Sequence, residues 1–371
     1  MKSGFFIWML IFYLLGNIYI FWRIWQMLPF HNLTSKIVYI FCALLLCSSL
    51  FMGMFLSARN VLPMSLNSAL YQIGSTWIII FLYLLMFILL RDIILIFIPR
   101  YIRNNGNFHA ITGFISLGFA LLLLIYGHIN YLHKKHIEIN ISSEKLTTEK
   151  LKIVAISDLH LGYNIGNNEL AKWIKIINNQ NPDIILIAGD IIDNNVEILE
   201  KRNTSDILRQ LHSKYGVYAC FGNHDYFGGD LRRNEKFITD SDITLLADTT
   251  MQVAGISITG RADRSDRRRK PLKELVATSD TSKFSILLDH QPYNLNQAVE
   301  NGIDLQISGH THRGQIFPIN LLTDRMYELS HGYMQRHSTH FYVSSGIGIW
   351  GGKFRIGSQS EYIVINLNHP N

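Results

Sequence analysis

Long apolar stretches, hardly interrupted by charged residues, dominate the first third of the chain. They lie at 4–22, 37–56, 77–90 with a continuation beyond Arg91 and Asp92, and 110–126. Each is close to the roughly 20 residues that an α-helix needs to cross about 30 Å of hydrocarbon. No small-residue cleavage site follows the first stretch, which argues against a removed signal peptide. The pattern predicts four membrane-spanning helices, with three or five as the alternatives.

Beyond residue 134 the apolar stretches become short, as in a water-soluble domain. Alternating apolar and polar residues at 136–141 predict a half-buried strand, and the apolar run 151–157 predicts a buried one. Further strands are expected at 183–188, 217–221, 243–246, 251–259, 284–288, 305–308, 340–344 and 361–367, and helices at 168–179 and around 191–213. Strands alternate with helices first and dominate later, which predicts two packed sheets with helices outside.

These patterns divide the 371 residues into a four-helix transmembrane region at 1–131, a linker with the first strand at 132–149, and an α/β (α+β) domain at 150–371. Charged residues make up 17% of the chain, below the roughly 25% of soluble domains. Residues 1–150 hold 11 Lys and Arg against 4 Asp and Glu, and the remaining 221 hold 23 against 24. The positive charge belongs to the membrane region, so no nucleic-acid partner is expected.

Basic residues near the apolar stretches bear on the topology. Those on the side of both chain ends are Lys2, Arg59, Lys134 and Lys135, and those on the other side are Arg23, Lys36, Arg91, Arg100 and Arg103. Cytoplasmic loops carry the excess of Lys and Arg, so a multi-pass protein of the cell membrane is predicted, with its second domain outside the cytoplasm by a small margin. Arg91 and Asp92 are expected to mark an interfacial helix end rather than a functional pair, because neighbours in a helix do not face each other.

Five polar motifs each follow an apolar strand, where ligands usually bind in an α/β sheet. They read SDLH at 157–160, GDIID at 189–193, GNHD at 222–225, DHQP at 289–292 and GHTH at 309–312. In an extended segment, D-x-H and H-x-H each direct two side chains to one face. Carboxylates with imidazoles suit Mn²⁺, Fe or Zn²⁺ better than Ca²⁺, and no motif contains the cysteine of a thiolate zinc site. Each motif alone is typical of a turn, but five in order predict a metal centre.

In this order the motifs resemble those of the calcineurin-like metallophosphoesterase family. SDLHLG, GHTHRGQ and YVSSGIGIWGGKFRIG at 342–357 resemble its membrane-associated branch, with YaeI-like and YkuE-like phosphodiesterases and transmembrane metallophosphoesterases. The resemblance covers about residues 136–371. It implies a four-layer α/β/β/α domain with two mixed sheets. It also implies a phosphodiesterase or pyrophosphatase that uses a metal-bridging water as nucleophile. The enzyme would bind two divalent metal ions, with Mn²⁺ as the expected metal and Fe or Zn²⁺ as the alternatives.

The resemblance also implies a role for each motif residue. Asp158, His160 and His312 would bind one ion, Asn223, His290 and His310 would bind the other, and Asp190 would bridge them. His224 would protonate the leaving oxygen or steady the phosphoryl charge, with Asp225 fixing its tautomer and orientation. Asp193 would hold a ligand imidazole or a backbone group, and an ordinary carboxylate at a helix start is the equal alternative.

Three arginines are candidates for substrate binding. Arg313 stands where the branch usually has a small residue, and its guanidinium is expected either to bind a substrate phosphate or to point to solvent. Arg268 and Arg269 belong to the basic segment 261–270, interpreted either as a solvated charge run or as a contact for anionic lipid headgroups. Trp350 in the segment 347–354 is expected to be core, with an apolar lip for an acyl chain as the alternative.

The expected partners are the lipid bilayer and a phosphoester substrate. A membrane tether favours a lipid-linked phosphodiester or pyrophosphate, and soluble nucleotides or generic phosphodiesters are the alternative. A non-catalytic scaffold on the same fold is a more remote reading, because all eight positions of the family pattern are intact in this chain. The sequence leaves the oligomeric state open.

Overall fold

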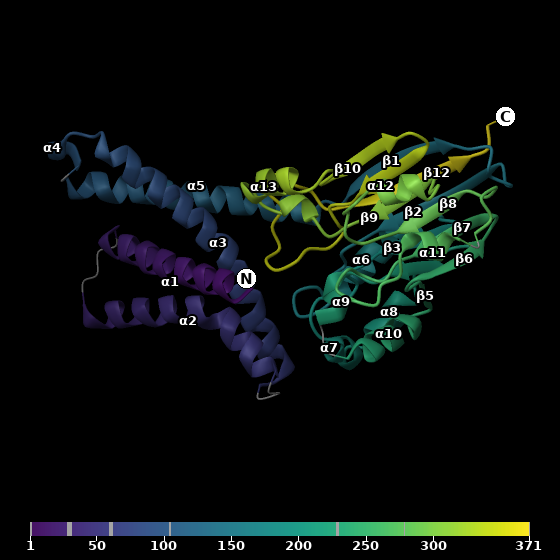
Figure 1. Ribbon diagram of the computed structural model, residues 1–371. Helices are drawn as coiled ribbons and strands as arrows, with labels where there is room; N and C mark the ends of the chain where they lie inside the picture. The colour runs from purple at the N-terminus through teal and green to yellow at the C-terminus, as the bar shows by residue number, and fades with distance from the viewer. Residues whose placement is uncertain are drawn as a thin grey trace. The chain divides into compact units, whose positions relative to one another are not determined.

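The computed structural model describes residues 2–27, 32–58, 62–103, 105–227, 230–277 and 279–370. The chain divides into two compact units: a helical unit, Met1–Ile129 with Gly351–Phe354, and a sheet unit, Asn130–Trp350 with Arg355–Asn371. Figure 1 shows the long helices of the first and the strands of the second. Arg59 of the topology argument lies outside the described residues.

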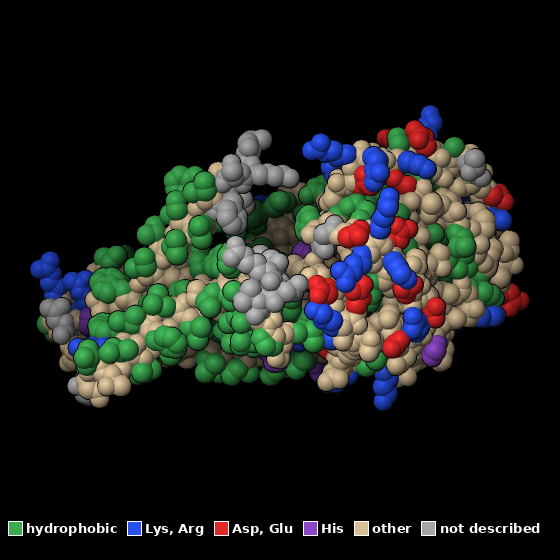
Figure 2. Space-filling view, turned by 90° about the horizontal axis from the view of Figure 1, so that it is seen from below, with side chains coloured by type: hydrophobic (Ala, Val, Ile, Leu, Met, Phe, Trp, Pro, Cys, Tyr) green, Lys and Arg blue, Asp and Glu red, His purple; other side chains and the backbone are tan. Residues whose placement is uncertain are grey.

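The helical unit contains the apolar helices that the sequence predicts. They are α1 (Lys2–Met27), α2 (Leu33–Ala58), α3 (Met64–Ile96) and α5 (Gly106–Leu132), with a short α4 (Arg100–Arg103) between the last two. Four of these helices are long and apolar enough to cross a membrane. Large apolar side chains cover their surface, as Figure 2 shows, and Trp8 and Leu122 are 72% and 65% exposed. Such a surface suits contact with hydrocarbon, where the backbone hydrogen bonds must be made within each helix.

Helix α3 gives Arg91 and Asp92 partners on neighbouring helices. It continues past them to Ile96, and Arg91 Nη1 donates to Asp92 Oδ1 at 2.8 Å. Arg91 Nε also donates to Thr112 Oγ1 of α5, and Arg23 of α1 pairs with Asp92. Although neighbours in a helix point in different directions, these side chains are long enough to turn together toward partners on α1 and α5. Pairing of this kind is what a charge within a helical bundle requires.

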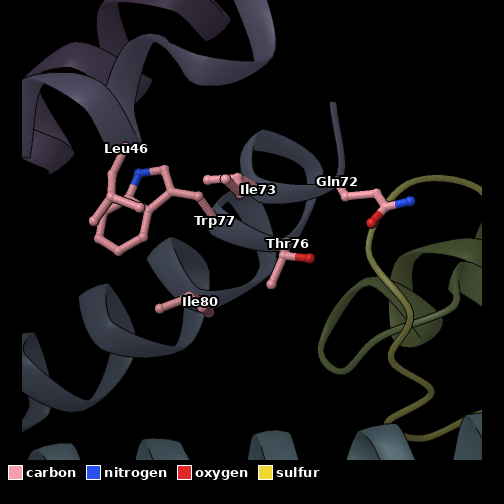
Figure 3. Close-up of a pocket in the computed structure, with 6 residues that line it drawn as sticks. All are labelled: Leu46, Gln72, Ile73, Thr76, Trp77 and Ile80. Atoms are coloured by element: carbon pink, nitrogen blue, oxygen red, sulfur yellow. The ribbon is translucent and has the colours of Figure 1, made fainter. Parts of the chain in front are cut away.

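A cavity of about 300 Å³ lies between α2 and α3 (Figure 3). Its lining is formed by Leu46, Gln72, Ile73, Thr76, Trp77 and Ile80. The walls are mostly apolar, and they include none of the predicted metal ligands.

The sheet unit is built on two six-stranded mixed sheets. The first has the order β1 (Lys135–Ser142), β12 (Glu361–Asn368), β2 (Lys150–Ile156), β3 (Ile184–Ala188), β4 (Val217–Cys220) and β5 (Ile243–Leu245). The second has the order β10 (Gly332–Arg336), β11 (Thr339–Val343), β9 (Leu305–Ser308), β8 (Ser285–Leu288), β7 (Ile256–Gly260) and β6 (Thr249–Val253). Strands β2, β3 and β4 are parallel neighbours, as are β7, β8 and β9, so their carboxyl ends lie at common edges.

Alternating side chains place each sheet between two apolar layers, since successive residues of a strand point to opposite faces. Ile153 of β2 packs in a cluster with Ile286 and Ile307 of the second sheet, whereas Val154 packs with Trp173 of α6 (Asn167–Asn178). On the outer face of the second sheet, Leu287 and Phe341 pack against residues of α11 (Leu272–Val276) and α12 (Asn296–Glu300). The predicted four-layer α/β/β/α fold is therefore confirmed.

Two expected elements are divided in the structure. The helix expected at 191–213 is two short helices, α7 (Val196–Lys201) and α8 (Thr204–Leu208), because Asn203 takes a left-handed conformation with φ of 50°. The strand expected at 251–259 is the hairpin of β6 and β7, which turns at Ala254 and Gly255, both with positive φ. Strand β10 and helix α10 (Leu231–Thr239) have no counterpart in the sequence-based prediction.

Candidate metal centre

All five polar motifs lie just beyond the carboxyl ends of strands, in loops or, for GNHD, at the start of a short helix. Asp158 follows β2, Asp190 follows β3 and Asn223 follows β4, while His290 follows β8 and His310 follows β9. Within each sheet these strands are parallel neighbours, so their loops meet at one edge. The two edges together bring residues more than 150 positions apart in the chain into contact, as His160 and His312 show.

The backbone at these motifs is not the extended segment that the sequence suggested. Asp158, His160, Asp190, His310 and His312 all have positive φ, between 47° and 72°. This left-handed region is costly for residues other than glycine, and such residues concentrate at functional sites. The two side chains of D-x-H and of H-x-H therefore converge because of tight loops, and the alternation of a strand is not the cause.

Two glycines make room for the carboxylates. A Cβ at Gly222 would collide with Oδ1 of Asp190, and one at Gly309 would collide with Oδ2 of Asp158. The backbone also holds these carboxylates, since the N–H of His224 donates to Asp190 Oδ1 at 2.8 Å and the N–H of His310 donates to Asp158 Oδ1 at 3.0 Å. The glycines of GNHD and GHTH thus serve close packing around the site.

The first group of potential ligands consists of Asp158, His160 and His312, whose donor atoms lie within 4.8 Å of one another. Nε2 of His160 is 3.0 Å from Nε2 of His312, and Oδ1 of Asp158 is 3.5 Å from the latter. All three side chains are buried. Nδ1 of His160 lies 3.3 Å from Oδ1 of Asp193, which leaves Nε2 facing the other members of the group.

The second group consists of Asp190, His290 and His310. Oδ2 of Asp190 lies 3.1 Å from Nε2 of His290 and 3.6 Å from Nε2 of His160, so this carboxylate stands between the two groups. Nδ1 of His310 is 2.7 Å from Oδ1 of Asn223, which adds an amide oxygen to the second group. The structure therefore brings together all seven residues for which the resemblance implies metal binding.

The environment of His290 tests whether a cation fits. Its Nδ1 lies 2.7 Å from the carbonyl oxygen of Ala188, which can only accept, so Nδ1 carries a hydrogen and Nε2 is the nitrogen that faces Asp190. Among the described residues, this buried Nε2 makes no hydrogen bond, although Asp190 Oδ2 is 3.1 Å away. A ring nitrogen and a carboxylate oxygen that face each other in the interior are stabilised by a shared cation, either a proton or a metal ion. The donor set thus fits metal binding.

The charges of the site favour the same interpretation. Burial, followed by the neighbouring His290, lowers the pKa of His310 to about 4, and burial with His160 and Arg355 lowers that of His312 well below its usual value. Both imidazoles are therefore neutral and can act as ligands. Burial alone would raise the pKa of Asp190, but the positive field of His290 outweighs it and holds this carboxyl ionised.

The surroundings of His224 correct the role expected of Asp225. His224 Nδ1 lies 2.9 Å from the carbonyl oxygen of Asp193 and 3.4 Å from its Oδ1. Asp225 instead accepts hydrogen bonds from the backbone N–H groups of Gly222 and Ile192, at 2.7 and 2.9 Å. Successive residues of α9 (Asn223–Phe227) point in directions about 100° apart, so Asp225 turns away from its neighbour. Asp193 orients His224, and Asp225 holds the loops together.

The pKa of His224 follows from this contact. Burial alone would lower it, whereas the hydrogen bond to Asp193 and the negative field of Asp190 raise it to about 9. Without metal ions in the site, the imidazole is therefore protonated at neutral pH. With Nδ1 engaged by Asp193, Nε2 is the nitrogen from which a proton can be donated.

The three arginines proposed for substrate binding have different environments. Arg269 pairs with the buried Asp289, as does Arg261, so Arg269 is part of the fold, whereas a solvated charge run or a headgroup contact was expected. The side chain of Arg268 is 87% exposed and pairs with Asp266. Arg313 is half-buried, and within the described chain its side chain forms no ion pair.

Arg355 is a structural residue of the site that the sequence analysis missed. It is fully buried, and its guanidinium donates to the carbonyl oxygens of His312, Ser345 and Gly348 at 2.9, 2.6 and 2.8 Å. It therefore ties the loop that carries His312 to the loop after β11. In the sequence, this arginine is marked by being a charged residue that precedes the small and apolar residues of RIGS at 355–358.

Aromatic rings flank the site beside His224 and beside His310. Phe227 and Trp350 lie beside His224, with ring centroids at 5.5 and 6.4 Å, and they are 65% and 52% exposed. Trp350 is therefore a surface residue and not core as expected. Tyr327 lies beside His310, with ring centroids at 6.2 Å.

Comparison with known proteins gives consistent similarities. Residues 151–314 match the family described as Calcineurin-like phosphoesterase. A metallophosphoesterase of Campylobacter jejuni is 35% identical over 262 residues, which cover 68% of this chain and 69% of that protein. A transmembrane protein with metallophosphoesterase domain of Danio rerio is 31% identical over 282 residues, covering 71% and 64%. A solved 5'-nucleotidase precursor from Thermus thermophilus has 16% identity, covers 59% of this chain and 54% of its own, and gives a TM-score of 0.35.

Proposed function

The chain belongs to the calcineurin-like metallophosphoesterase family and is a metal-dependent phosphoester hydrolase; from this premise we propose that it is a membrane-anchored phosphodiesterase or pyrophosphatase for a lipid-linked substrate. The observation that carries the proposal is the position of Asp190 between two groups of buried ligands, with His224 beside it and held by Asp193. Four apolar helices in the same chain keep such a site close to a bilayer.

The residues around Asp190 suit two divalent cations. One ion would be held by Asp158, His160 and His312, and the other by Asn223, His290 and His310. Asp190 would contribute to both ions. Such ions, with Mn²⁺ favoured over Fe or Zn²⁺, supply polarisation of the phosphoryl oxygens and lower the pKa of a bound water. Burial of the ligands excludes bulk water, so the charges in the site act with little screening.

His224 supplies the proton for the leaving group. Its Nδ1 is engaged by Asp193, and Nε2 delivers a proton to the oxygen that departs from phosphorus. The hydrogen bond and the negative charge of Asp193 favour the protonated imidazole that this transfer requires. The side of the site near His224 is therefore the leaving-group side.

Phe227 and Trp350 support a lipid as the leaving group. Both rings lie beside His224 and are more than half exposed, so an apolar alcohol that accepts the proton would cover them. Burial of apolar surface contributes about 25 cal/mol per Å², which a small polar leaving group would not gain. A soluble nucleotide, the alternative substrate, would use these rings only by stacking its base on them, so the assay below must separate the two substrate classes.

The test is metal-dependent hydrolysis of bis-p-nitrophenyl phosphate by the detergent-solubilised full chain, beside Asp190→Asn. The variant is expected to lose bound Mn²⁺ and activity together, because the shared ligand no longer carries a charge. Full activity of the variant would refute the two-metal assignment. A second assay compares a short-chain phospholipid with a soluble nucleotide diester. Preference for the soluble diester would refute the lipid-linked substrate.

A further inference from the structure

A row of three side chains, Tyr327, Tyr293 and Arg264, leads away from the metal site at His310. The ring of Tyr327 lies 6.2 Å from the ring of His310, and the ring of Tyr293 lies 5.0 Å from that of Tyr327. The two hydroxyl groups are hydrogen-bonded at 3.0 Å. The guanidinium carbon of Arg264 stands 4.3 Å from the centre of the Tyr293 ring.

The topology of the second sheet explains why these residues meet. Arg264 follows β7, Tyr293 follows β8, and Tyr327 ends α13 (Ile319–Met326), which follows β9. Strands β7, β8 and β9 are parallel neighbours, so their following loops lie side by side at the edge that carries His290 and His310. The row is therefore built on the same edge as the metal ligands.

The side chains of the row are accessible. Tyr293 is 37% exposed, Arg264 is exposed and Tyr327 is half-buried. Within the described chain, Arg264 forms no ion pair, unlike Arg269 with Asp289 and Arg268 with Asp266. A positive charge that keeps its hydrogen-bonding capacity thus lies at the outer end of two tyrosine rings.

This chemistry selects a particular kind of group. Tyrosine rings and hydroxyls bind a sugar or a base by stacking and hydrogen bonding, and a guanidinium binds a phosphate or carboxylate with two parallel hydrogen bonds. A phosphodiester has two substituents on phosphorus, and His224 with Phe227 and Trp350 marks the side of the one that leaves. The substituent that remains is the one that can extend along the row at His310.

We propose that Tyr327, Tyr293 and Arg264 form a subsite for the substituent that remains on phosphorus, and that this substituent is a ring carrying a second anionic group. The inference rests on the proposed function. Water adds to phosphorus, the bond from phosphorus to the apolar alcohol breaks, and the alcohol oxygen takes its proton from His224. The product is a phosphomonoester that keeps the ring and its second anion.

Two matched pairs of substrates test the subsite in the detergent-solubilised full chain with Mn²⁺. The soluble pair is thymidine 5'-(p-nitrophenyl phosphate) with and without a 3'-phosphate, and the lipid pair is dioctanoyl phosphatidylinositol with and without a 4-phosphate. Within each pair only the second anion differs. We expect kcat/KM to be about 10- to 100-fold higher with the second phosphate, the effect of a hydrogen bond to a charged group.

Arg264→Gln is expected to bring this ratio close to one, because the glutamine keeps hydrogen bonding without the charge. Arg233→Gln is the matched control, since it removes an exposed arginine of α10 that is paired with Glu200, and it should keep the full ratio. A higher kcat/KM with the second phosphate in both pairs supports the shared chemistry. The same increase in the lipid pair alone identifies a lipid headgroup, and in the soluble pair alone it identifies a nucleotide-like substrate.

Other outcomes overturn the subsite. A ratio near one in both pairs of the wild-type protein, a ratio unchanged by Arg264→Gln, or failure to hydrolyse either pair would each do so. Hydrolysis of bis-p-nitrophenyl phosphate distinguishes failure of the subsite from failure of the proposed function. If that diester is hydrolysed in a metal-dependent way, the hydrolase stands and only the subsite fails; if it is not, both fail together.

Discussion

Arg355 is predicted to be essential for the stability of the site, and Arg355→Met is the change that tests this. The methionine fills a similar volume and removes the charge with its donors. Three buried carbonyl oxygens, those of His312, Ser345 and Gly348, would lose their hydrogen bonds to the guanidinium. Because the residue is fully buried, water does not replace these donors without a change in packing.

The magnitude follows from the contacts. Each hydrogen bond from a charged donor contributes about 1.5–3 kcal/mol, and relief of the buried charge offsets part of the sum. We expect a net loss of about 3 kcal/mol in the free energy of unfolding, or a fall in Tm of about 6–12 °C for a domain of this size. Binding of Mn²⁺ should weaken by about 10- to 100-fold, as for other residues that hold a ligand in position.

The assay is thermal unfolding of the full chain in detergent, followed by intrinsic fluorescence, together with titration of Mn²⁺. Arg355→Lys is the matched control. One ammonium cannot reach three carbonyl oxygens that are now divided between Nη1 and Nη2, so this variant should lie between the wild type and Arg355→Met. A Tm and a Mn²⁺ affinity equal to those of the wild type in Arg355→Met would refute the reasoning.

Two further predictions concern proton transfer and pH. His224→Ala is expected to retain Mn²⁺ and to lower kcat by about 10²–10⁴-fold for an alcohol leaving group, with a smaller loss for bis-p-nitrophenyl phosphate, whose leaving group needs little protonation; loss of metal would contradict the role of His224. For Glu361, burial alone would raise the pKa, but the hydrogen bond and charge of His331 outweigh it and lower the pKa below the ordinary 4.5. Its contribution to stability is therefore present above pH 4.5 and is lost as the pH falls through the lower folded value. Glu361→Gln should flatten this acid limb in urea unfolding, and parallel curves for variant and wild type would contradict it.

The sequence allowed much of the fold to be predicted because its strands are short apolar runs that end in polar motifs. Where one residue could redirect the chain, the prediction failed. Asn203 with its left-handed backbone divides a helix, and Ala254 with Gly255 turns a strand into a hairpin. Such turns depend on single conformations that the hydrophobic pattern does not record.

Only part of the metal-ligand set could be predicted from the sequence. Residue types and strand ends indicate a metal centre, but contact of His160 with His312 depends on packing of two sheets, and only the family resemblance implied it. The exchange of roles between Asp193 and Asp225 depends on the direction of side chains around one turn of α9. The alternation argument for D-x-H reached the correct pairing for the wrong reason, since both residues have left-handed backbones.

That left-handed backbone has a consequence for mutational scanning of the site. An alanine at Asp158 or Asp190 would remove a carboxylate and also introduce a residue that disfavours positive φ, so the measured loss would combine ligand chemistry with loop distortion. Asparagine tolerates this conformation and keeps the shape of aspartate. Aspartate-to-asparagine exchanges therefore keep the loop conformation and report the loss of the charge and of one oxygen ligand. A routine alanine scan would overstate the importance of these positions for catalysis.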